Sequence, residues 1–193
     1  MRPKPSSKIE PRMNGEGKMR RDLTMEASKV VLSAPLQQLK DEHVSLRGDM
    51  DLIYEITEEI EFDSGPAVAQ LFAKLYERIS AFNDKLKAHS KCEEVGLFPV
   101  MARHLENNDR TIEVMEYEHE KAEQHLQDFL TEADKLGPAI DENDAQAITV
   151  YAVQALATLT QHFAKEEKVL FPLAENILSV DEMKELERLL QAR

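Results

Sequence analysis

The stretch HSKCEEVGLFP at residues 89–99 and the stretch HFAKEEKVLFP at residues 162–172 are two copies of one pattern. Six of the eleven positions are identical, including the histidine, both glutamates and the Leu-Phe-Pro that closes each copy. Residues four apart on a helix are rotated by only about 40° and rise by about 6 Å, so each HxxxE can direct an imidazole and a carboxylate to the same point. The pattern therefore favours two related helices with matched polar groups.

Upstream of each copy stands a second matched motif, the pair Glu42-His43 in the first half and Glu118-His119 in the second. The intervals to the histidines of the repeat are similar, 46 residues in the first half and 43 in the second. Each half thus predicts a helical hairpin, with one histidine on its first helix and an HxxxE pair on its second.

Apolar residues around these motifs recur at alternating spacings of three and four over four long segments, the period of an amphipathic helix. The four segments are separated by breaker residues at 63–66, 107–108 and 137–138. Short connections between amphipathic helices predict an all-α, antiparallel up-down-up-down four-helix bundle. The inward face of the fourth helix is expected to continue past Glu166 through Val169 and Leu173.

Prolines and a capping signal refine this prediction. Pro99 and Pro172 fall inside helical stretches, so the second and fourth helices should kink or break there. Residues 179–182 read as a capping box that opens a short fifth helix through Leu190. We therefore expect a bundle over residues 33–177 and a short C-terminal helix, packed on the bundle, over residues 178–193.

The first 32 residues differ from the rest, and we expect them to form a mobile, basic N-terminal tail. Residues 1–21 carry seven Lys or Arg against two Glu, three prolines and no apolar periodicity. The whole chain of 193 residues has a net charge of -13, which argues against nucleic acid as a partner. The single cysteine, Cys92, excludes a disulfide framework and any Cys-rich metal site. With no long apolar run, we expect a cytoplasmic protein without a membrane partner.

The four histidines should lie at one level of the bundle. Counting residues from each histidine to the end of its hairpin places all four about 26 to 36 Å from the same end, at 1.5 Å per residue. A single inward histidine also fits a hydrogen-bonded core residue, and one HxxxE is common on amphipathic helices. Four histidines in equivalent inward positions, two with a glutamate one turn later, instead favour a metal site.

Such a layer needs compensation, because buried polar groups require partners and buried charges require opposite charges. Two cations supply it, and nitrogen and oxygen donors without thiolate suit iron, manganese or zinc. Histidine and glutamate sets on the helices of a bundle are the usual arrangement for dinuclear iron. We expect two Fe ions (Fe2+ or Fe3+, with or without an oxo or hydroxo bridge), with Zn or Mn as alternatives and open positions for O2, peroxide, NO or water.

The doubled Glu-His and the doubled HxxxEExxLFP resemble the hemerythrin-like, or HHE cation-binding, family, over about residues 35–175. The resemblance implies a non-haem di-iron site, in which Glu93 and Glu166 bridge the metals. The six ligands that it implies are His43, His89, Glu93, His119, His162 and Glu166.

The sequence departs from the oxygen-carrying hemerythrins, whose third helix has HxxxH, because it has HEKAE at residues 119–123. Glu123 lies on the same helical face as His119 and is a seventh candidate ligand. Its alternatives are a hydrogen-bond acceptor behind the ligands or a partner for Arg47, at the matching position of the first helix. An anionic oxygen in place of a neutral imidazole favours oxidised metals, which argues against reversible oxygen carriage.

The expected function is a di-iron protein that binds or reacts with O2, NO or peroxide, or senses or exchanges iron, in a stress response. One alternative is repair of damaged iron centres, since the doubled pattern is similar to proteins of that kind. Those proteins carry an N-terminal region with cysteines that residues 1–32 do not match. The other alternative is a metal-stabilised interaction module without redox chemistry. The sequence leaves catalysis, and any protein partner, undecided.

Overall fold

The computed structural model describes residues 30–62, 65–107, 109–136 and 140–191, and all the regular structure of these residues is helical. The helices belong to one compact unit, residues 31–193. Almost all of the expected N-terminal tail, residues 1–29, lies outside the described residues. The α-helices of the described residues are α1 (Ala34–Phe62), α2 (Pro66–Cys92), α3 (Phe98–Ala102), α4 (Thr111–Leu136), α5 (Glu142–Lys165), α6 (Phe171–Ile177) and α7 (Val180–Gln191).

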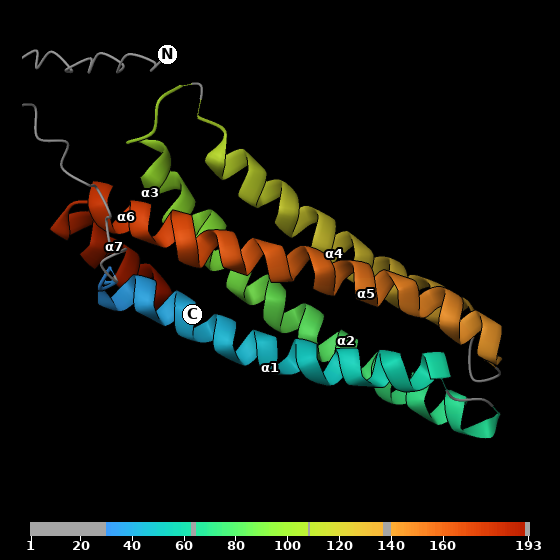
Figure 1. Ribbon diagram of the computed structural model, residues 1–193. Helices are drawn as coiled ribbons and strands as arrows, with labels where there is room; N and C mark the ends of the chain where they lie inside the picture. Colours follow the sequence, from blue (N-terminus) through green and yellow to red (C-terminus); the bar gives the residue numbers. More distant parts are fainter. Residues whose placement is uncertain (1–29, 63–64, 108, 137–139, 192–193) are drawn as a thin grey trace, which may run out of the picture. The chain divides into compact units, whose positions relative to one another are not determined.

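Four long helices, α1, α2, α4 and α5, form the bundle, and they lie alongside one another in Figure 1. Contacts run around a ring from α1 to α2, α4, α5 and back to α1, so helices that are consecutive in the chain are antiparallel neighbours. Their apolar stripes meet in a core that extends from Leu46 to Phe163. The predicted all-α bundle is confirmed. None of the described helices is long and apolar enough to cross a membrane.

Each copy of the sequence repeat contains a five-residue π-helical turn. The first, η1, covers Glu93–Leu97 between α2 and α3, and the second, η2, covers Glu166–Leu170 between α5 and α6. The backbone N–H that follows each turn bonds five residues back, from Phe98 to the carbonyl of Glu93 and from Phe171 to that of Glu166. A proline follows each of these residues, and its missing N–H opens the α-helical ladder there. The predicted interruptions at the two prolines are confirmed.

The π-turn η2 corrects the predicted face of the fourth helix. A π-turn holds one residue more than an α-helical turn, so the residues beyond it are rotated by about 100°. Val169 is accordingly 58% exposed, and Leu170 is only 1% exposed. The expectation that Val169 faces inward was wrong, because a strict helical period cannot include the extra residue.

Helix α7 begins with the expected capping box. The backbone N–H of Ser179 donates to the carboxylate of Glu182, and the N–H of Glu182 donates to the Ser179 hydroxyl. The helix packs on α1 and on η1, where a Cβ at Gly96 would come within 3.1 Å of Leu186. Val169 stands at the equivalent position of η2 and is exposed.

The cap of α7 has a testable pH dependence. Contacts with His104 and Ser179 lower the pKa of Glu182 from 4.5 to about 2. A lowered folded-state pKa stabilises the native state above pH 4.5, and the contribution is lost as the pH falls through about 2. We expect the difference in melting temperature between the wild-type protein and Glu182→Gln to shrink over this window. A difference that is constant from pH 5 to pH 2, followed by circular dichroism, would contradict this assignment.

Candidate metal centre

The four histidines of the sequence motifs meet in the middle of the bundle. His43 comes from α1, His89 from α2, His119 from α4 and His162 from α5, and none is more than 2% exposed. They form two pairs. The Nε2 atoms of His43 and His89 lie 3.0 Å apart, and the ring centroids of His119 and His162 are 4.4 Å apart.

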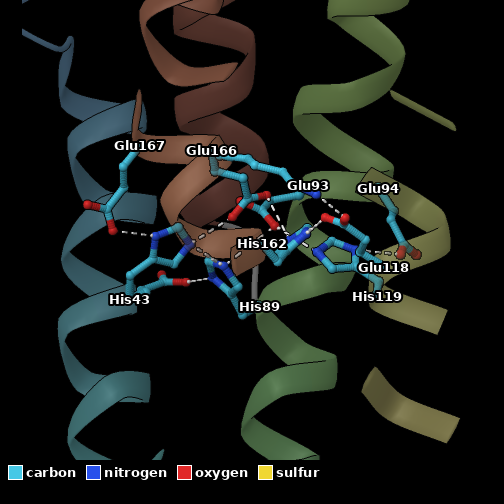
Figure 2. Close-up of polar contacts among 11 residues, drawn as sticks. His43, His89, Glu93, Glu94, Glu118, His119, His162, Glu166 and Glu167 are labelled. Atoms are coloured by element: carbon cyan, nitrogen blue, oxygen red, sulfur yellow. Dashed lines mark hydrogen bonds and ion pairs between the residues drawn. The ribbon is translucent and has the colours of Figure 1, made fainter. Parts of the chain in front are cut away.

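Glu93 and Glu166, each the first residue of a π-turn, lie between the two histidine pairs (Figure 2). Both carboxylates are fully buried. The oxygens of Glu166 lie 3.2 Å from His43 Nε2 and 3.1 Å from His162 Nε2. An oxygen of Glu93 lies 3.5 Å from His89 Nε2 and 3.4 Å from His119 Nε2. Each glutamate therefore contacts one histidine of each pair.

These six residues make two clusters, each with the donors for one metal ion. In each cluster, one donor atom from every residue lies within 4.8 Å of the others. The first cluster is His43, His89, Glu93 and Glu166, and the second is Glu93, His119, His162 and Glu166. Glu93 and Glu166 belong to both clusters, so their carboxylates could serve as ligands for an ion held in either cluster.

Each of the four histidines also contacts a carboxylate through its other ring nitrogen, Nδ1. A carboxylate there accepts a hydrogen bond from Nδ1–H, which fixes the tautomer and leaves Nε2 free to bind a metal. The four contacts from Nδ1 are His43 to Glu167 at 3.0 Å, His89 to Glu42 at 2.9 Å, His119 to Glu94 at 2.9 Å and His162 to Glu118 at 3.2 Å. Figure 2 shows Glu167, Glu94 and Glu118 around the central group.

Two of these outer carboxylates are held by cations. Arg47 donates to Glu167 over 2.6 Å, and Lys165 donates to Glu118. The Arg47 guanidinium also lies 5.5 Å from the ring centroid of Phe163. These ion pairs restrain the two outer carboxylates, which in turn orient the imidazoles of His43 and His162.

The electrostatics of the centre favour positive charge. Burial alone lowers the pKa of His119, but the carboxylates of Glu93, Glu166 and Glu94 outweigh it and raise this pKa to about 9. Burial alone raises the pKa of Glu166, but contacts with His162 and His43 outweigh it and leave the pKa below its ordinary value. A buried carboxylate that stays ionised favours a positive charge beside it, either a protonated imidazole or a metal cation.

The hydrogen bonding of the centre also fits metal ions. Six buried donor atoms of the clusters have no hydrogen-bond partner within the described part of the chain. These are both oxygens of Glu93, both oxygens of Glu166, His119 Nε2 and His162 Nε2. Burying such groups without partners is costly, and coordination to a cation compensates it. Nitrogen and oxygen donors without thiolate suit iron, manganese or zinc.

The seventh candidate, Glu123, is not brought into either cluster. Helices α2 and α4 are antiparallel, so Glu93 lies one turn beyond its histidine toward α3, while Glu123 lies one turn from His119 in the opposite direction. Burial and the neighbouring Glu94 raise the pKa of Glu123. Arg47, the suggested partner, donates to Glu167 instead.

The outer carboxylates Glu42, Glu94, Glu118 and Glu167 are the residues whose contacts the sequence did not predict. Glu94 and Glu167 follow the inward glutamates directly along the chain, and each reaches a histidine of the neighbouring helix. The signal for all four was present, since each repeats with its histidine or glutamate in both halves.

A helical bundle with two histidine and glutamate clusters in its core defines a cation-binding bundle protein. The hemerythrin HHE cation-binding domain family matches residues 34–174, which is more than half of the chain. The chain therefore belongs to this family. No curated protein and no solved structure matches the chain significantly.

Proposed function

We propose that the chain binds two iron ions, one in each cluster, and uses them to bind or react with a small ligand such as O2, NO or peroxide. The observation that carries this proposal is that the two clusters share Glu93 and Glu166. Shared carboxylates hold two metals close enough to act on one small molecule, whereas a structural zinc site needs only one closed set of ligands.

In this proposal the protein's own residues bind the metal ions and orient the histidine ligands. His43, His89, His119 and His162 supply one Nε2 each, and each keeps its Nδ1 proton, which it donates in a hydrogen bond to an outer carboxylate. Two iron ions, when bound, would supply Lewis acidity and two electrons, which with two protons convert one hydrogen peroxide into two waters. The apolar core around the clusters excludes bulk water from the reacting molecule.

The test is metal loading followed by spectroscopy. Protein loaded anaerobically with Fe2+ should hold two irons per chain, and exposure to O2 or peroxide should produce a ligand-to-metal charge-transfer band in the visible range. Parallel loading with Zn2+ should give binding without that band. Less than about one iron per chain, or two irons whose spectrum is unchanged by O2, NO and peroxide, would overturn the proposal.

A further inference from the structure

The two halves of the centre differ at one buried position beside the histidines. Phe163 follows His162, and Ser90 stands at the matching place after His89. The ring of Phe163 stacks on the imidazole of His43, with centroids 4.2 Å apart and an interplanar angle of 22°. Ser90 is 1% exposed, so it is buried like Phe163 at the matching place. One half therefore has an aromatic ring where the other has a hydroxyl.

The remaining contacts show that His43 and His119 occupy equivalent places in the two halves. The outer carboxylate of each comes from the second glutamate of the opposite repeat, Glu167 or Glu94. An aromatic ring of the Leu-Phe-Pro sequence stacks on each imidazole, with centroid distances of 5.5 Å for Phe171 on His43 and 5.8 Å for Phe98 on His119. Because Phe163 lies beside His43, the matching residue Ser90 is expected beside His119.

The hydroxyl of Ser90 is not hydrogen-bonded to its own helix. A serine or threonine inside a helix ordinarily donates to a carbonyl three or four residues back. Thr158 and Thr160 of α5 do this, with bonds of 3.0 Å and 2.8 Å to Gln154 and Leu156. Ser90 Oγ has no hydrogen-bond partner among the residues that the structure describes. A buried hydroxyl kept without a partner is costly, and its donor is available to another molecule.

We propose that the small ligand binds at the cluster of His119 and His162, and that Ser90 donates a hydrogen bond to it. The inference rests on the proposed function, because it needs metal ions in both clusters. At the cluster of His43 and His89, the ring of Phe163 covers the imidazole of His43 and offers no donor. The ligand is of the class that this arrangement fits, a small anion or a diatomic molecule with a hydrogen-bond acceptor.

Azide is a suitable probe for this assignment in the chain loaded with two irons. We expect Ser90→Ala to raise the dissociation constant of azide about tenfold, the effect of losing one hydrogen bond to a charged group. The infrared stretching band of bound azide should shift between H2O and D2O in the wild-type protein and not in Ser90→Ala. Ser90→Thr keeps the hydroxyl and should retain the shift.

Thr149 provides a matched control. It is a second buried hydroxyl without a partner in the described chain, and it lies about 20 Å along α5 from His162. Thr149→Val should leave the azide affinity and the isotope shift unchanged. If Ser90→Ala retains two irons with the azide affinity and isotope shift of the wild type, this inference is overturned while the proposed function stands. If the wild-type chain holds no iron pair, both are overturned.

Discussion

If the chain binds two metal ions as we propose, alanine in place of Glu166 is expected to remove both, although it changes a single residue. Glu166 is a member of both clusters, and its two oxygens lie near His43 on one side and His162 on the other. Its loss takes one of four donor residues from each cluster. We expect the metal affinity of both clusters to fall by more than about a hundredfold, which exceeds the effect of losing a residue that only contacts a ligand. Glu93→Ala should behave in the same way.

Two comparison variants make this prediction specific. His43→Ala removes a donor from the first cluster only, so about one metal per chain should remain. Glu167→Gln removes only the carboxylate behind His43, and the two metals should remain with an affinity weakened about 10- to 100-fold. Metal content is measured by mass spectrometry after dialysis against a fixed free metal concentration. Equal losses in His43→Ala and Glu166→Ala would show that Glu166 does not serve two metals.

Removal of the proposed metal ions is expected to destabilise the bundle strongly. Metal bound to the native state alone contributes about 4 kcal/mol when its free concentration is a thousand times the dissociation constant. For a domain of this size, that free energy corresponds to a fall of about 8 to 16 °C in melting temperature on chelation. The physical reason is that Glu93 and Glu166 are fully buried and have no hydrogen-bond partner within the described chain.

The double variant Glu93→Gln, Glu166→Gln tests the origin of this effect. Neutral amides are poor metal ligands, so the melting temperature of the variant should be almost the same with and without chelator. Glu182→Gln alters a carboxylate on α7 outside both clusters and should keep the full difference. Calorimetry with and without chelator measures all three proteins. A wild-type protein that holds two metals and melts unchanged after their removal would contradict the prediction.

The fold could be predicted from the sequence because its main signals are local. Apolar residues at helical spacing, breaker residues between the segments and the capping box at Ser179 each act within a few residues. The type of interruption at Pro99 and Pro172 could not be predicted in this way. A proline shows that the α-helical ladder opens, but whether the chain then kinks, stops or adds a residue depends on the packing of the segment beyond it.

The candidate site was predictable in its centre and not in its surroundings. Repetition picked out the four histidines and two glutamates, since chance does not place the same polar residue inward on matched helices. Contacts between helices follow from their packing, so the contact of Glu94 with His119 and the pairing of Arg47 with Glu167 needed the structure. Glu123 shows the same limit, because the direction of its helix decides on which side of the histidine it lies.

One hairpin of this bundle contributes two histidines and a single glutamate of the inner six, and so it completes neither cluster alone. A chain of half this length would form the centre only as a symmetric dimer, in which each copy contributes its glutamate to the cluster of the other copy. The present chain is equivalent to such a dimer fused into one polypeptide. Within one polypeptide the two halves need not be identical, and they differ where Ser90 of the first repeat matches Phe163 of the second.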